Sequence, residues 1–236
     1  MRKYAGSHND LQHTSDAAME QPMVWITNSK DRSPAELLWV PKTAWGNLGG
    51  SLLNLSYGTG RVFIVPHEEI GGKWQGAVCE LPMPAFPTGI MRGRFASDGS
   101  LYTSGMFAWA GSASAPGGFY RIRRGDTPAH VPLAIHAAKG SISITFSEPL
   151  EPASVKPESF ALKIWSLNRS SNYGSKHANE HPLSISTASL DKDARTVKLT
   201  IPDLAPTQCY ELLVKLLAPG GAAVVRSIHG TIHATK

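Results

Sequence analysis

Two arginines, Arg92 and Arg94, are the residues whose type and spacing most clearly indicate chemistry. They stand two positions apart in the run IMRGRF, which has the composition of a strand, so both side chains should leave one face of a sheet. Two guanidinium groups on one face repel each other unless an anion lies beside them, and guanidinium pairs well with carboxylate. The pair therefore predicts an anion-facing surface, bound either to a ligand or to groups of the same sheet, such as Glu68, Glu69, Glu80 or backbone carbonyls.

A histidine next to two carboxylates, His67-Glu68-Glu69, is a second candidate, because such a cluster can supply a general base or a metal ligand. Neighbouring strand residues point to opposite faces, so His67 and Glu68 would need other partners to share a site. A locally bonded turn histidine is the alternative. His177 and His181 are four residues apart, but they would bind a metal together only on a helix, and their segment has no apolar period.

Aromatic residues are frequent in the first half of the chain, where they could form a carbohydrate-binding platform or pack sheet on sheet. The candidates are Trp45, Tyr57, Phe63, Trp74, Phe107, Trp109, Phe119 and Tyr120. The sequence contains no Gly-x-Ser-x-Gly elbow, phosphate loop, His-Glu-x-x-His motif or Cys-x-x-Cys-His haem attachment. It therefore offers no catalytic signature of those classes.

Composition limits the partners. The 236 residues are 42% hydrophobic and 17% charged, as expected for a chain that forms a core, and the net charge of +5 is too mild for a nucleic-acid-binding module. No apolar run approaches the roughly 20 residues needed to cross a bilayer, and residues 1–22 lack the apolar centre of a signal peptide. The two cysteines, Cys79 and Cys209, leave a disulfide open.

Short strands separated by glycine and proline turns must position these residues, which predicts an all-β fold. Strands are expected from 23–27 onward to 119–124, at a spacing typical of a sandwich or propeller. Beyond about residue 128 the pattern alternates cleanly, as in SISITF and TVKLTI, which is typical of half-buried strands in a small immunoglobulin-like sandwich. Residues 168–182 are predicted to be a long polar loop within it.

Two resemblances extend this interpretation. The run WVPKTAWGNLGGSLLNLSYGTGRVFIVPHEEIGGKWQGAVCELP, with the segments up to GGFYRIRR, resembles the last blades of large multidomain proteins of planctomycete- and verrucomicrobia-type bacteria, which often carry haem-binding cytochrome modules. Their six-bladed β-propeller is similar to the soluble quinoprotein sugar (glucose/sorbosone) dehydrogenases, which bind pyrroloquinoline quinone. The residues that match the order of motifs in that wider family are Arg92, Arg94, Asp98, Gly99, Leu101, Tyr102, Tyr120 and Arg121.

The second half, SISITFSEPLEPASVKPESFAL with ARTVKLTIPDLAPTQCYELLV, resembles bacterial immunoglobulin-like domains. Residues 1–22 are polar and aperiodic and are expected to form an N-terminal segment. For the rest, the resemblances imply about two C-terminal propeller blades over 23–128 and an immunoglobulin-like β-sandwich over 129–236. Because a six-bladed propeller needs roughly twenty or more strands, the chain is expected to be the C-terminal part of a longer protein whose upstream blades are its partner.

Three functions follow as hypotheses. The first is a non-catalytic scaffold and interaction part of a larger periplasmic or extracellular protein. The second is a fragment of a quinone-dependent sugar or alcohol dehydrogenase, in which Arg92 and Arg94 would hold cofactor carboxylates and a cytochrome c module could be a partner. The third is a carbohydrate-binding module with a sugar or polysaccharide ligand. The first is preferred for this chain, and an oxidoreductase role is assigned to the parent protein only; no metal site and no catalytic residue are expected here.

Overall fold

A computed structural model describes residues 20–109, 111–168 and 174–236, and within them the chain is all-β, as the sequence predicts. The segment predicted over 1–22 lies outside these residues except for its last three. The strands are β1 (Pro34–Trp39), β2 (Leu52–Ser56), β3 (Val62–Ile64), β4 (His67–Ile70), β5 (Lys73–Glu80), β6 (Gly89–Phe95), β7 (Leu101–Met106), β8 (Gly117–Ile122), β9 (Pro132–Ala138), β10 (Ser141–Phe146), β11 (Phe160–Asn168), β12 (Lys176–Leu183), β13 (Thr187–Leu190), β14 (Thr196–Thr200), β15 (Thr207–Leu217) and β16 (Ala223–Ile232). Short 3-10 turns η3 (Gly46–Leu48), η4 (Pro152–Ser154) and η5 (Pro157–Ser159) join some of them.

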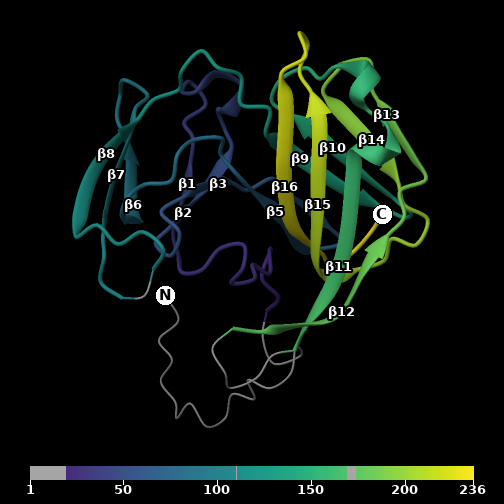
Figure 1. Cartoon of the computed structure of the whole chain (residues 1–236), viewed down its shortest axis with the longest axis horizontal. Helices are drawn as coiled ribbons and strands as arrows, with labels where there is room; N and C mark the ends of the chain where they lie inside the picture. Colours follow the sequence, from purple (N-terminus) through teal and green to yellow (C-terminus); the bar gives the residue numbers. More distant parts are fainter. Residues whose placement is uncertain (1–19, 110, 169–173) are drawn as a thin grey trace.

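The largest sheet runs through both halves of the chain (Figure 1). Its order is β1-β2-β3-β5-β16-β15-β11-β12, with β4 also paired to β5. The junction is the antiparallel pair β5–β16, where Cys79 faces Ile228 and Ala77 faces Gly230. A Cβ at Gly230 would meet the Tyr210 ring at 2.5 Å, so glycine lets that ring pack against the junction. The domain boundary expected at 128/129 falls in the connection from β8 to β9. The large sheet nevertheless joins strands from both sides of this boundary, through the backbone pairing of β5 with β16.

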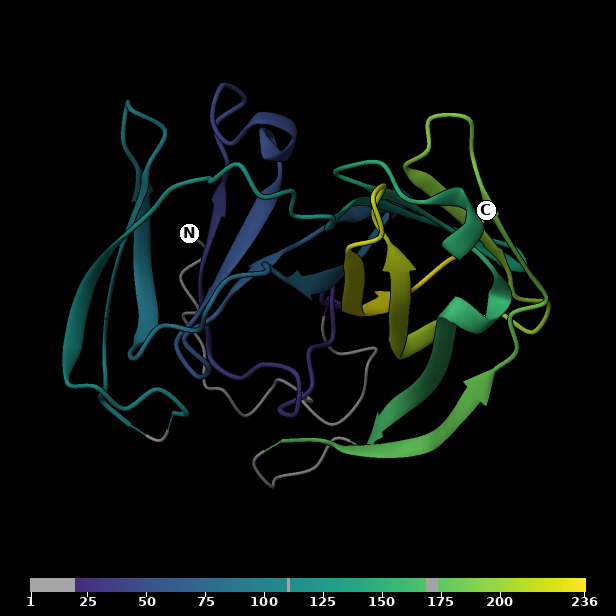
Figure 2. The same ribbon diagram turned by 45° about the horizontal axis from the view of Figure 1, so that its top comes forward.

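A four-stranded sheet, β13-β14-β10-β9, lies against the β11–β15–β16 part of the large sheet. The expected alternation of β10 is confirmed, because Ile142, Ile144 and Phe146 are buried while Ser143 and Thr145 between them are half-buried. They share one hydrophobic core with Leu212 and Val214 of β15. Two sheets packed face to face over a common apolar layer form the sandwich on the right of Figure 2.

The third sheet, β6-β7-β8, stands on the other side of the molecule, at the left of Figures 1 and 2. Its inner face packs on β1 and β2: a Cβ at Gly93 would lie 2.9 Å from the Leu55 side chain. Ile90, Leu101 and Thr103 are buried on that face. The outer face has no covering layer among the described residues.

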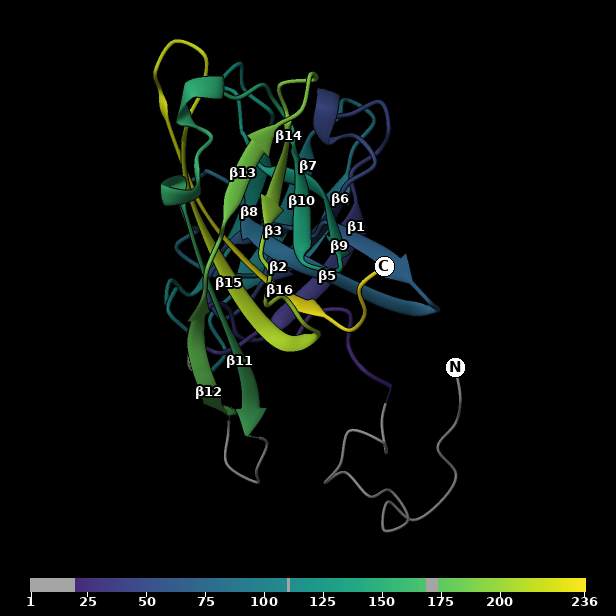
Figure 3. The ribbon, with the colours of Figure 1, turned by 90° about the vertical axis from the view of Figure 1, so that its right-hand side faces the viewer.

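Two predictions of secondary structure are wrong, one of a strand and one of a loop. The run 23–27 is not a strand; its Trp25 N–H donates to Thr231 Oγ1 at 2.8 Å, while Met23, Val24 and Ile26 pack on a small apolar cluster. The loop expected over 168–182 contains β12, which pairs with β11 and reaches beyond the rest of the molecule (Figure 3). An edge strand exposed on both faces needs no apolar alternation, so its sequence resembles a loop.

Candidate functional site

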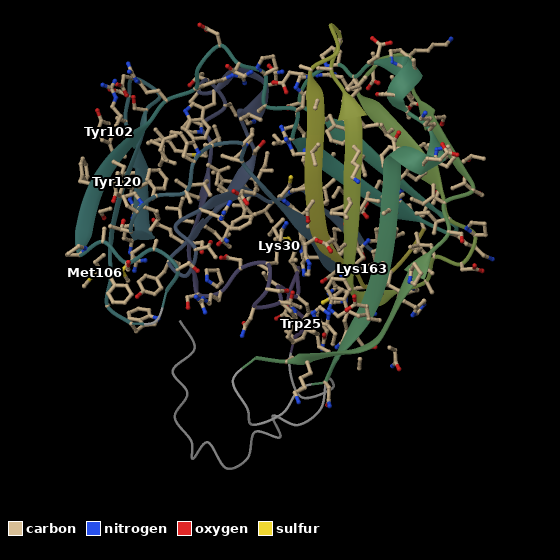
Figure 4. The ribbon with its side chains drawn as sticks, in the orientation of Figure 1. Trp25, Lys30, Tyr102, Met106, Tyr120 and Lys163 are labelled. Carbon is tan, nitrogen blue, oxygen red and sulfur yellow. The ribbon has the colours of Figure 1, made fainter. Side chains whose placement is uncertain are left out.

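The outer face of β6-β7-β8 collects the residues that the sequence singled out. Residues directly opposite each other on antiparallel strands share a face, so the register defines two cross-strand rows there. We call this surface the arginine–aromatic face; its residues are Arg92, Ser104 and Phe119 in one row and Arg94, Tyr102 and Arg121 in the other. Figure 4 places Tyr102 and Met106 on this sheet, on the side of the molecule away from Trp25 and Lys163.

The aromatic part of this face is stacked and open to solvent. The Tyr102 and Phe119 rings lie 5.7 Å apart at an interplanar angle of 21°, and Phe119 is 72% exposed. The Arg121 guanidinium lies 5.7 Å from the centre of the Tyr102 ring, in the position of a cation–π contact. The stacked rings of Tyr102 and Phe119 offer a flat apolar surface, and the Arg121 guanidinium lies over the Tyr102 ring.

The arginines of the face differ in how well they are neutralised. Arg94 donates to Glu36 at 2.5 Å, and the Gly93 N–H donates to the same carboxylate at 2.6 Å. Burial acts to raise the pKa of Glu36, but these two hydrogen bonds and the arginine charges outweigh it, so the pKa lies below its usual value. Arg92 donates only to its neighbour's carbonyl, Met91 O, at 2.9 Å, and its side chain is exposed.

Arg121 is paired as well. It donates to Asp98 at 2.8 Å and to Ser100 Oγ at 2.9 Å, beside the Asp-Gly turn that the sequence marks. Hydrogen bonds from Ser100 and the charge of Arg121 lower the pKa of Asp98. Arg92 is therefore the one arginine of the face without a hydrogen bond to a carboxylate among the described residues.

Arg92 and Arg94 do not form a pocket for a quinone by themselves. One is already neutralised by Glu36, and neither lines any of the four principal hollows of the described chain. A planar tricarboxylate needs walls as well as cations. Any such site would need groups that this face does not provide.

The His67-Glu68-Glu69 run is split between two surroundings. The His67 ring bonds Val65 O through Nδ1 at 2.8 Å and lies beside exposed Trp39 and Trp74. Glu68 turns toward β9, where it accepts the Ala137 N–H at 2.9 Å and contacts His136 Nδ1 at 2.5 Å. The two side chains do not share a site, and Glu68 instead ties the two halves of the chain together.

The later histidines are also separate. Both lie on β12, where His177 stacks on Trp165 at 4.5 Å and bonds Glu180, while His181 bonds Asn179 O at 2.7 Å. No group of three His, Cys, Asp or Glu side chains is arranged to hold a metal ion within residues 20–109, 111–168 and 174–236.

The aromatic candidates divide between core and surface. Trp45, Tyr57 and Phe63 are buried, whereas Trp74, Phe107, Trp109 and Phe119 are exposed. Tyr120 lies on the inner face of β8, where its hydroxyl meets Thr88 Oγ1 at 3.0 Å.

The cysteines are free and buried. Burial raises the pKa of Cys79 to about 11 and that of Cys209 to about 12, so both thiols stay protonated. No helix within the described residues has the length and apolar composition of a membrane span.

No known protein-family model, curated protein or solved structure matches this chain. The resemblance of the sequence to propeller and immunoglobulin-like proteins therefore stays an expectation.

Sequence reasoning missed Glu36, which stands 58 residues from Arg94, and nothing local indicates that the two meet. Tyr102 and Phe119 are singled out by the sequence, but for other reasons. Only the register of β7 and β8 places them on the same face as Arg92 and Arg94.

Proposed function

We propose that this chain is a non-catalytic scaffold and interaction part of a larger extracytoplasmic protein, and that the arginine–aromatic face with the adjoining edge of β8 receives the preceding part of that protein. The observation that carries the proposal is the uncovered outer face of β6-β7-β8, with Phe119 exposed and Arg92 lacking a carboxylate partner among the described residues.

The edge of β8 supports a strand-adding partner. Within the described residues β8 pairs only with β7, so its other edge has unpaired backbone groups along Gly117–Ile122. An open edge is a template for another strand, and propeller blades have four strands where this sheet has three. The run β1-β2-β3-β5 beside it would be the preceding blade in this proposal, joined through β16 to the sandwich. The partner would be an upstream blade.

The charge of the face defines the partner further. A strand added beside β8 would lie next to Phe119 and Arg121, with Arg92 farther across the same face. Its side chains should therefore be apolar near the stacked rings and acidic near Arg92. The quinone-dependent dehydrogenase and cytochrome c hypotheses concern that parent protein, and a periplasmic or extracellular location belongs to the same proposal.

Mixing the chain with the separately produced upstream segment should give a one-to-one complex by size-exclusion chromatography with light scattering. Phe119→Ala and Arg92→Glu should each weaken it by about tenfold or more, because central aromatic and arginine residues dominate interfaces. Val225→Ala is the matched control, since Val225 is 60% exposed on β16, away from this face. Equal affinity for all variants, or no complex, would contradict the proposal.

A second candidate function is carbohydrate binding, on a different surface. Trp39 and Trp74 are 57% and 53% exposed, and the His67 ring lies between them at 5.6 and 5.8 Å. The three rings make a continuous aromatic strip beside exposed Glu69, which faces Trp74 in the register. Sugars stack their C–H faces on such rings and bond the polar groups beside them.

Affinity electrophoresis in gels containing soluble neutral polysaccharides tests this second function. Retardation should fall about tenfold or more in Trp39→Ala and Trp74→Ala, given the apolar area each indole would bury. Phe107→Ala is the control, because Phe107 is exposed but makes no ring contact with the described residues. Unretarded wild-type protein in every gel would rule out this strip as a polysaccharide site.

A further inference from the structure

A hollow of about 670 Å³ lies where the two halves of the chain meet. It is bounded by the end of β8, by the connection 125–130 to β9, which crosses between the two sides of the molecule (Figure 2), and by the β15–β16 hairpin. Its walls are mainly apolar, with Trp45, Leu48, Leu81, Met83, Ile122 and Val224 among them. The volume falls in the range of roughly 300–1,000 Å³ that small-molecule sites occupy.

The permanently charged side chains in this hollow are all positive. Arg123, Arg124 and Arg226 line it, and none of its lining residues is acidic. Arg124 is paired with Glu148 at 3.1 Å, and Glu148 does not line the hollow, whereas the partners of Arg226 among the described residues are the carbonyl oxygens of Ala129, His130 and Val225. Arg123 is exposed and forms no hydrogen bond or ion pair within the described chain.

Two strained residues shape the walls, and an arginine holds each of them. Trp45 has φ +56° and His130 has φ +45°, a region that residues with a side chain rarely adopt. Arg124 donates to Trp45 O and Arg226 donates to His130 O, while the Trp45 indole donates to Gly99 O at 3.0 Å. Fixed backbone of this kind keeps the apolar walls and the guanidinium groups in one arrangement, as a preformed binding site requires.

We propose that this hollow binds a small amphipathic carboxylate, with its apolar body against Trp45, Leu81 and Ile122 and its carboxylate on Arg123. The proposal is independent of the arginine–aromatic face. A neutral apolar molecule would leave Arg123 unpaired, and a small hydrophilic anion would leave the walls uncovered, so the pairing of the two features selects a ligand that has both. Because the hollow lies at the junction, an occupant would contact both halves of the chain.

Two dyes of almost the same shape separate charge from apolarity in the full chain. 1-Anilinonaphthalene-8-sulfonate is an amphipathic anion, and N-phenyl-1-naphthylamine is its neutral counterpart. Fluorescence titration should give one site for the anionic dye, weakened about tenfold by Arg123→Ala, because a charge-assisted hydrogen bond is lost. The neutral dye should be unaffected by that change. Arg32→Ala is the matched control, since the Arg32 guanidinium bonds Ser112 elsewhere on the surface.

Two more measurements test where the dyes bind and whether the site prefers a carboxylate. Ala222→Trp narrows the hollow from its exposed hairpin side and should weaken both dyes. Octanoate should displace the anionic dye at concentrations where octanol does not. Equal binding of the anionic dye to wild type and Arg123→Ala, no effect of Ala222→Trp, or displacement by octanol as readily as by octanoate would each overturn the proposal.

Discussion

Replacing Glu148 by alanine should lower the free energy of unfolding by about 2–3 kcal/mol, because leaving a buried hydrogen-bond donor without its partner costs about 1–3 kcal/mol. Glu148 is 8% exposed and accepts hydrogen bonds from the His130 N–H at 2.6 Å, Arg124 at 3.1 Å and the Ser147 hydroxyl. Burial acts to raise the pKa of Glu148, but these donors outweigh it and lower the pKa. Without the carboxylate, a buried N–H and a guanidinium lose their partner at the junction of the two halves.

Chemical denaturation at neutral pH measures this effect. The control is Glu151→Ala, because the Glu151 side chain makes no hydrogen bond or ion pair with the rest of the described chain; only its backbone is bonded, to Leu217 and Ser154. Glu151→Ala should change stability by less than about 0.5 kcal/mol, as surface substitutions usually do. A loss below about 1 kcal/mol in Glu148→Ala would show that Arg124 and His130 find other partners.

Acidification should remove about 3 kcal/mol of stability through one histidine, His229. His229 is 2% exposed on β16, bonds Trp25 O at 3.0 Å and lies against Trp165. Burial lowers its pKa from 6.5 to about 4. Above pH 6.5 the His229 side chain is neutral in both the folded and the unfolded chain, so its titration does not change the free energy of unfolding. Between pH 6.5 and 4 only the unfolded chain gains the proton, so stability falls as pH falls through that window.

The difference between wild type and His229→Gln isolates this histidine from the carboxylates that also titrate in acid. Unfolding free energies measured from pH 7 to pH 4 should give a wild-type minus variant difference that shrinks by about 3 kcal/mol over this range. His181→Gln is the matched control for the substitution itself, because the His181 ring is exposed and bonds Asn179 O on β12. A difference that stays constant with pH would mean that His229 is protonated in the folded state or exposed to water.

Local patterns predicted the all-β class because strand periodicity is a property of neighbouring residues. Ile142, Ile144 and Phe146 are buried together, as their alternation requires. The same rule placed Arg92 and Arg94 on one face of β6, which the register of β6 with β7 bears out.

Non-local pairing could not be predicted in this way. The contact of Cys79 with Ile228, which joins the two halves, depends on which edges of two apolar strands meet, and many edges of similar composition compete for it. The Glu36–Arg94 pair depends on β1 lying beside β6. The polar segment Lys176–Leu183 forms strand β12 because its backbone pairs with the edge of β11. In each case the deciding partner is distant in sequence.

Our central proposal is that this chain belongs to a longer protein, in which the open edge of β8 and the arginine–aromatic face are covered. Hydrogen–deuterium exchange of the peptide that spans Gly117–Ile122, compared between this chain alone and the full-length parent, tests it most directly. We expect these amides to exchange rapidly in the chain alone. In the longer protein their exchange should be slowed by about a hundredfold or more, because the free amides of β8 would be hydrogen-bonded to an added strand. The same rapid exchange in both proteins would contradict it.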